Sequence, residues 1–236
     1  MPVGQPLPNP AKYLPMMKCK TISVLLALAG AFTAAQAQDA VGNKDAGKEK
    51  AAMCIGCHGI VGYQATFPEV HKVPMISGQN GKYIVAALTA YKKGDRKHPT
   101  MRGQATTLSD KDMADLAAYY EAHKGSSVKT VSDTPAVAPS TEVAALLTKG
   151  ACASCHGANY NKPIDGAYPK LAGQHADYLY VALRAYGTEG NNRMGRTNAI
   201  MSAQVKPYKR SELKAMADYM ASLPGDVAVV PQSKFR

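Results

Sequence analysis

The sequence has few of the large apolar side chains that normally build a protein core. Its 236 residues include no Trp and only three Phe, although 11 Met and 13 Tyr are present. A chain of this length suits two domains of about 100 residues each. Domains of that size with so few bulky side chains would have thin cores. The composition therefore predicts that each domain encloses a large apolar group.

A hydrophobic run long enough to cross a membrane is also lacking. The apolar run at residues 21–33 falls short of the about 20 residues that span a bilayer. Basic residues precede it, and the small-x-small sequence Ala35-Gln36-Ala37 follows it. We therefore expect residues 1–37 to form a signal peptide that is cleaved after Ala37, which places the mature protein in the periplasm. A retained membrane anchor is the less favoured alternative.

The segment before this signal matches no part of a signal peptide. Residues 1–15 are rich in Pro, so an over-extended start is expected, with Met16 or Met17 as the true one. Cys19 lies before the apolar run, whereas a lipidated Cys follows such a run. No lipoprotein is therefore expected.

Acidic residues are the scarcer charged class. The chain has 28 Lys and Arg against 17 Asp and Glu, and loss of residues 1–37 would leave 25 basic residues against the same 17. No Lys/Arg-rich run of the nucleic-acid-binding type occurs, and export excludes nucleic acid as a partner. A basic surface then favours an acidic protein partner or a loose peripheral association with an anionic membrane, or is simply well solvated.

The chain contains two copies of one unit. The segment CIGCHG at residues 54–59 recurs as CASCHG 98 residues later. The same order of matches continues with PMISGQ at 74–79 and PKLAGQ at 169–174, and with ADLAAY at 114–119 and KAMADY at 214–219. Residues 124–140 between the copies have no helical period. We therefore predict a first domain over residues 38–130, a linker over 131–140 and a second domain over 141–236.

Each copy has helical periodicity and no alternating strand pattern, so the predicted class is all-α. Helices are expected at residues 43–53, 81–93 and 109–123 of the first copy, and at 141–151 and 176–186 of the second. The Ser109 hydroxyl can cap the amides of Lys111 and Asp112. In the second copy Lys209 and Arg210 occupy this region, so the sequence does not fix where its last helix begins.

The Cys-x-x-Cys-His motif is the attachment sequence of c-type haem. Two thiols about one helical turn apart add across the two vinyl groups, and the adjacent His reaches the iron from the same side. The motif predicts two covalently bound haem c groups, each with a His as its proximal iron ligand. The predicted residues are Cys54, Cys57 and His58 for the first haem and Cys152, Cys155 and His156 for the second.

Two other uses of paired cysteines are a redox dithiol and a zinc ribbon. Zinc-ribbon pairs usually lie about 15 to 20 residues apart, whereas 94 residues separate Cys57 from Cys152. A thioredoxin-like motif requires a βαβ context that the periodicity does not indicate. Haem attachment is therefore the favoured interpretation.

The second axial ligand of each haem must come from elsewhere in its copy. Met101 and Met201 each lie 18 residues before a matching Tyr, which makes them the best equivalent pair. The second copy has five extra residues before Met201, so Met194 is a competing ligand there. A thioether opposite imidazole raises the reduction potential and closes the iron to substrate, which indicates an electron carrier.

Several other side chains were considered as axial ligands. They are His71, Met75 and His98 in the first copy and His175 in the second. Met75 aligns with Lys170, and His98 aligns with Asn198, so neither can be a ligand shared by both copies. The expected role of His98 is a solvated loop histidine.

With these motifs in order twice, residues 43–224 resemble the cytochrome c4 family, whose members have two class I cytochrome c domains. The resemblance implies His58 with Met101 and His156 with Met201 as axial pairs. It also implies that the carbonyl groups of Pro74 and Pro169 accept hydrogen bonds from the proximal His Nδ1 atoms. The departures from the family pattern are the inserted residues 187–196, Gln104 where the family often has Met, and the uncapped last helix.

The resemblance implies a periplasmic carrier of single electrons between a quinol-oxidising complex (a quinol-cytochrome c reductase) and a terminal oxidase or other acceptor. The alternative is a dihaem subunit of a periplasmic dehydrogenase. The third hypothesis is a dihaem enzyme in which one haem has a labile or unusual axial ligand. No catalytic residues are predicted.

Overall fold

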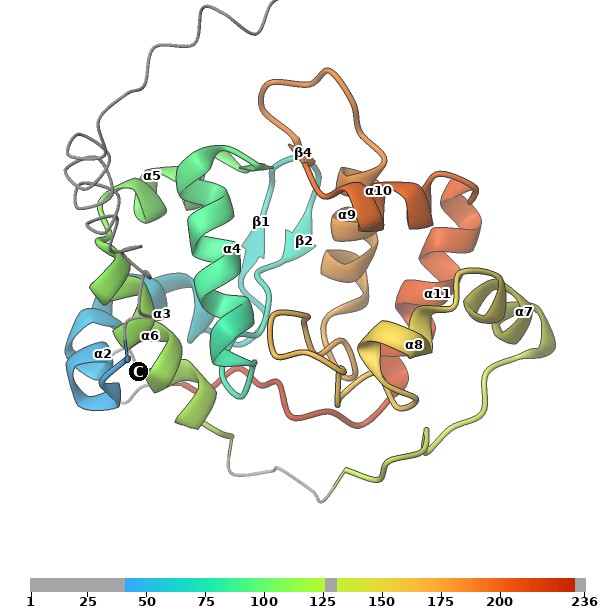
Figure 1. Ribbon diagram of the computed structural model, residues 1–236, viewed down its shortest axis with the longest axis horizontal. Coiled ribbons are helices and arrows are strands. Elements are labelled where there is room, and N and C mark those ends of the chain that lie inside the picture. The colour runs from blue at the N-terminus through green and yellow to red at the C-terminus, as the bar shows by residue number, and fades with distance from the viewer. Residues whose placement is uncertain (1–40, 126–130, 232–236) are drawn as a thin grey trace, which may run out of the picture. The chain divides into compact units, whose positions relative to one another are not determined.

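The computed structural model describes residues 41–125 and 131–231 (Figure 1). The predicted signal peptide at residues 1–37 lies outside these ranges. The structure is mainly helical, as predicted, with two small two-stranded sheets that the sequence did not indicate. No helix within the described ranges is both long and apolar enough to cross a bilayer.

Residues 41–125, the described part of the first half, contain five helices and a small hairpin. The helices are α2 (Lys44–Lys50), α3 (Ala52–His58), α4 (Gly81–Lys93), α5 (Pro99–Thr106) and α6 (Asp110–Ala122). The hairpin is formed by β1 (Gln64–Ala65) and β2 (His71–Lys72), which pair antiparallel. The prediction of helix at residues 81–93 is confirmed, and the predicted helix before the Cys motif is α2, followed directly by α3.

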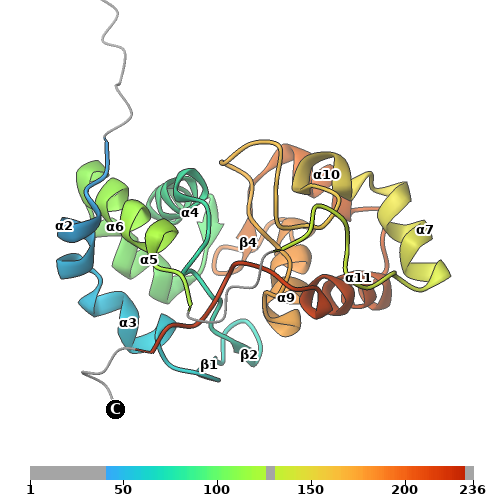
Figure 2. The same ribbon diagram turned by 90° about the horizontal axis from the view of Figure 1, so that it is seen from below.

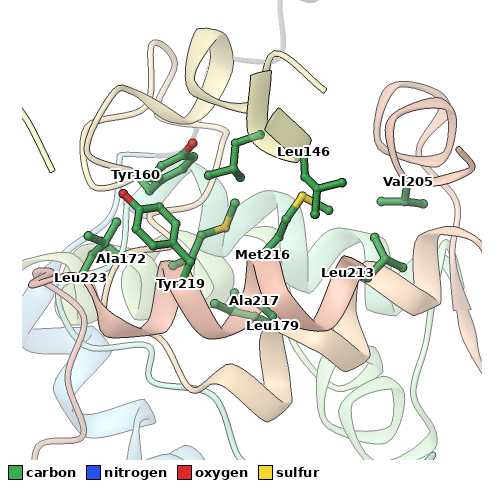
Figure 3. Packing of buried hydrophobic residues seen from close by; sticks show 12 residues of the cluster. Leu146, Tyr160, Ala172, Leu179, Val205, Leu213, Met216, Ala217, Tyr219 and Leu223 are labelled. Carbon is green, nitrogen blue, oxygen red and sulfur yellow. The ribbon is translucent and has the colours of Figure 1, made fainter. Parts of the chain in front are cut away.

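The second half repeats this order of helices. They are α7 (Thr141–Lys149), α8 (Cys152–His156), α9 (Ala176–Tyr186), α10 (Ala199–Val205) and α11 (Arg210–Ser222). The prediction of helix at residues 176–186 is confirmed as α9. Residues 131–140, the predicted linker, contain no helix or strand. Side chains of α11 form the centre of the core here, where Met216 and Tyr219 point toward Leu146 and Tyr160 (Figure 3).

In the last helix of each half, an acidic side chain in the first turn accepts a hydrogen bond from the backbone amide of the residue before the helix. In α6 the Ser109 hydroxyl accepts from the Asp112 amide at 3.1 Å, and the Asp112 carboxylate accepts from the Ser109 amide at 3.0 Å. In α11 the Glu212 carboxylate accepts from the Lys209 amide at 2.6 Å. Half of a capping box thus fixes the start of α11, which the sequence left open.

A glycine allows α2 and α6 to cross closely in the first half. A Cβ atom on Gly47 would lie 2.0 Å from the Asp115 carbonyl oxygen and 2.8 Å from the Tyr119 Cβ. Because the nearest atoms are mostly backbone, a side chain here would force the two helices apart. The packing of α2 on α6 thus depends on the missing side chain.

Replacing Gly47 with Ala is therefore expected to destabilise the protein by about 1–3 kcal/mol, the usual range for overpacking. Chemical denaturation followed by circular dichroism measures this change. The control is Gly103→Ala in α5, where a Cβ meets no atom within 4 Å and should leave stability unchanged or slightly raised. Equal stability of the two variants would contradict the close crossing.

Backbone pairing contributes to the contact between the two halves. Strand β3 (Arg96–Lys97) of the first half pairs antiparallel with β4 (Gly195–Arg196) of the second, and Arg96 lies opposite Arg196. The segment after α11 runs back along the first half, where Ala228 donates to the Ser77 carbonyl at 3.0 Å (Figure 2). Helical periodicity and motifs did not indicate this return of the chain.

Candidate haem-binding site

One cavity of about 800 Å³ extends through both halves of the structure. All of the residues that the sequence predicts to hold haem line it. They are Cys54, Cys57, His58 and Met101 from the first half, and Cys152, Cys155, His156 and Met201 from the second. The fold therefore brings every predicted site residue to a common internal surface.

Helix α3 positions the predicted haem-binding residues of the first half. Cys54 and Cys57 are three residues apart on this helix, so their side chains share one face. His58 ends the helix, and its Nδ1 lies 2.8 Å from the Pro74 carbonyl oxygen. A carbonyl can only accept, so Nδ1 carries the proton and Nε2 keeps a lone pair for a metal. Burial lowers the pKa of His58, and the hydrogen bond to Pro74 opposes this shift with a smaller effect. The lowered pKa favours the neutral form of the imidazole.

Helix α8 repeats the arrangement in the second half. His156 is buried, and its Nδ1 lies 3.2 Å from the Pro169 carbonyl oxygen. Burial again lowers the pKa of this imidazole, and the Pro169 bond opposes the shift. The prediction that Pro74 and Pro169 accept from the two histidines is thus confirmed.

The first thiol of each motif is in surroundings that disfavour the thiolate. Burial raises the pKa of both Cys54 and Cys152 above the ordinary value, whereas reactive redox thiols have lowered values. Within residues 41–125 and 131–231, no three His, Cys, Asp or Glu side chains are grouped so as to hold a metal ion. Neither observation supports the redox-dithiol or zinc-ribbon alternative.

The two predicted methionine ligands lie in equivalent helices. Met101 is in the first turn of α5, and its amide donates to the His98 Nδ1 at 3.4 Å. Met201 is in the first turn of α10, and its amide donates to the Asn198 Oδ1 at 2.9 Å. His98 is therefore a half-buried helix cap and not the solvated loop histidine that we expected. The aligned Asn has the same capping role.

The inserted loop of the second half holds the competing methionine away from the cavity. Met194 is absent from the cavity lining, and its amide donates to the Asn191 Oδ1 at 3.0 Å within the loop. The loop ends in β4, which pairs with the first half. Of the two candidates in this half, only Met201 faces the cavity. Among the other considered ligands, His71 lines the cavity and bonds the Glu69 carbonyl, whereas His175 lies outside the lining.

Two partly buried arginines that the sequence did not indicate line the cavity wall. Arg96 donates to the Tyr83 hydroxyl at 3.1 Å and Arg196 to the Tyr178 hydroxyl at 3.0 Å. Each guanidinium also lies over aromatic rings of its own half. Among the described residues no acidic side chain forms an ion pair with either one. A signal existed, since each Arg lies five residues before the predicted Met ligand of its half.

The sequence matches a family model, Cytochrome c, twice, at residues 45–123 and 140–224. Cytochrome c4 from Stutzerimonas stutzeri is 31% identical over 198 residues, which cover 78% of this chain and 90% of that protein. The thiosulfate dehydrogenase electron acceptor from Thiomonas intermedia is 29% identical and covers 90% of this chain and 94% of its own length.

The chain belongs to the cytochrome c4 family. The crystal structure of reduced recombinant cytochrome c4 from Pseudomonas stutzeri superposes with a TM-score of 0.54 at 28% identity, over 78% of this chain and 100% of that one. The structure of thiosulfate dehydrogenase (TsdBA) from Marichromatium purpuratum superposes with a TM-score of 0.52 at 27% identity, over 72% of this chain and 36% of that one.

As a cytochrome c4, the protein is a dihaem electron-transfer cytochrome with two covalently bound haem c groups. The residues present fit these groups. In each half the cavity wall provides the two thiols and the imidazole of the Cys-x-x-Cys-His motif. It also provides two partly buried guanidinium groups, which suit the anionic propionates of a haem because the planar guanidinium pairs well with carboxylates. The haems supply one-electron iron chemistry, and the chain holds and orients them.

Proposed function

We propose that the two haems are held by equivalent sets of residues. The thioether bonds come from Cys54 and Cys57 in the first half and from Cys152 and Cys155 in the second. The axial pairs are His58 with Met101 and His156 with Met201. The observation that supports this assignment is that all eight side chains line one cavity, with both Met-bearing helices capped in the same way.

The proposal includes a role for the two arginines of the cavity wall. Arg96 and Arg196 would pair with haem propionates where the two halves meet, since β3 and β4 place them opposite each other. Their tyrosine partners orient the guanidinium groups and leave other N–H donors available, because each guanidinium has five. Two positive charges close to the haems would favour the reduced form of both.

With both axial positions filled, the irons have no open coordination site, which suits a carrier of single electrons. We propose that it works in the periplasm, after removal of residues 1–37, between a quinol-oxidising complex and a terminal oxidase or other acceptor. The excess of basic residues supports electrostatic docking to acidic partners or the membrane surface.

A second candidate function is to accept electrons from a periplasmic dehydrogenase. Relatives from Stutzerimonas stutzeri and Thiomonas intermedia, 30% and 29% identical, are thiosulfate dehydrogenase electron acceptors. The likeness to the TsdBA structure favours the same partner class. In this alternative the cytochrome would receive electrons from thiosulfate oxidation, through an enzyme that holds the substrate.

Stopped-flow reduction distinguishes the two candidates. We expect the oxidised cytochrome to be reduced rapidly by a solubilised quinol-oxidising complex with quinol, and re-oxidised by membranes that contain a terminal oxidase. Both rates should fall as salt screens the basic surface. The control is thiosulfate alone, which should reduce neither haem. Rapid reduction only when thiosulfate dehydrogenase is added with thiosulfate would replace the first candidate with the second.

A further inference from the structure

Two buried glutamines reach across between the halves in a reciprocal arrangement. Gln174 of the second half accepts from the Met75 amide at 3.0 Å and donates to the Met75 carbonyl at 2.8 Å. Gln79 of the first half accepts from the Lys170 amide at 2.8 Å and donates to the Lys170 carbonyl at 3.0 Å. The exposed fractions of the two glutamines are 4% and 3%. Each side-chain amide thus binds both polar backbone groups of one residue in the opposite half.

The local backbone holds both glutamines in place. Gly78 and Gly173, which precede them, have φ of +79° and +75°, a conformation that favours glycine. The Oε1 of Gln79 also accepts from the Asn80 amide, and that of Gln174 from the His175 amide, both at 3.0 Å. With two N–H donors on each oxygen, the orientation of the side-chain amide is fixed.

The backbone groups that receive these contacts belong to the peptide units that hold the predicted proximal histidines. The peptide between Pro74 and Met75 has its carbonyl on His58 and its N–H on Gln174. The peptide between residues 169 and 170 has its carbonyl on His156 and its N–H on Gln79. A peptide whose N–H is hydrogen-bonded has a more strongly accepting carbonyl, because bonds in a chain polarise one another.

We propose that each glutamine is a positioning residue that lowers the reduction potential of the haem in the opposite half. Gln174 strengthens the bond from His58 to Pro74, and Gln79 strengthens the bond from His156 to Pro169. A stronger bond at Nδ1 makes the imidazole a more basic ligand, which stabilises ferric iron. The proposal rests on His58 and His156 being the proximal ligands.

The test is a redox titration of the holo-cytochrome with Gln174→Leu or Gln79→Leu, with the two haems distinguished by their assigned haem-methyl NMR signals. Gln174→Leu is expected to raise the reduction potential of the first haem and to leave the potential of the second haem unchanged. Gln79→Leu should do the reverse. The control is Asn80→Ala, which removes another hydrogen bond between the halves, to the Tyr168 carbonyl at 3.0 Å, and should shift neither potential.

Two further measurements separate this effect from loosened packing. The Nδ1 proton of His58 in the ferrous protein should move upfield in Gln174→Leu and stay in place in Gln79→Leu, since its hydrogen bond weakens only in the first. Gln174→Glu keeps an acceptor oxygen for the Met75 amide, so the first haem should stay at or below its wild-type potential.

A shift in the haem of the mutated half, an equal shift of both haems, or no shift would each overturn the proposal. A raised first-haem potential in Gln174→Glu would also overturn it. Failure of the ligand assignment itself gives a different result. In that case the Nδ1 protons of His58 and His156 in the wild-type protein would lack the ring-current shift of a haem ligand.

Discussion

Replacing Met201 with His is expected to remove half of the weak far-red absorption band that methionine sulfur gives with ferric haem, and to lower one of the two reduction potentials. Met101→His should remove the other half and lower the other potential. Exchange of thioether for imidazole favours ferric iron, and axial ligands set haem potentials over about 0.8 V, so each fall should be on the order of 0.2 V. Optical redox titration measures both quantities.

The inserted loop provides the control for this prediction. Met194 lies in the same segment of the chain but outside the cavity lining, so Met194→His should leave the band and both potentials unchanged. If Met201→His leaves the band intact while Met194→His removes half of it, the second haem is ligated from the inserted loop. If the wild-type protein shows the far-red methionine band from only one haem, the dihaem-enzyme hypothesis is favoured.

Removing both thiols of one motif is expected to unfold the corresponding half. The whole cavity measures about 800 Å³, and a buried cavity costs about 24 cal/mol per Å³, or roughly 19 kcal/mol in all and about 10 kcal/mol per half. This is an upper value because the cavity opens to solvent. It is still comparable with the whole stability of a domain, about 5–15 kcal/mol.

The variant for this test is Cys152→Ala with Cys155→Ala. It should lose one covalent haem, and limited proteolysis should cut the second half while sparing the first. The control in the same helical turn is Ser154→Ala, because the exposed Ser154 hydroxyl donates to the Ala151 carbonyl and makes only a long contact of 3.8 Å with the Cys155 sulfur, and its loss should keep both haems. A second half that resists proteolysis without its haem would mean that the protein core alone is sufficient.

Local signals predicted the helices and the attachment motifs well. The helices at residues 81–93 and 176–186 were placed from periodicity alone, and Ser109 acts as the cap that its sequence context indicates. Such features depend on neighbours within one or two helical turns, which a single sequence displays directly. The start of α11 was left open because its cap uses Glu212, a side chain that fits either a cap or a solvated surface.

The sequence by itself determined that two similar helical units each carry two thiols and a histidine in a haem-attachment motif. These facts follow from an exact motif, repeated in order. Tertiary structure alone decided that Met201 faces the cavity while Met194 does not. It also decided that Arg96 and Arg196 lie opposite each other on paired strands of the two halves. Likewise only the fold shows that Gln79 and Gln174 bind backbone in the opposite half. The glutamine contacts join residues 91 and 99 positions apart, for which neither spacing nor composition provides a signal.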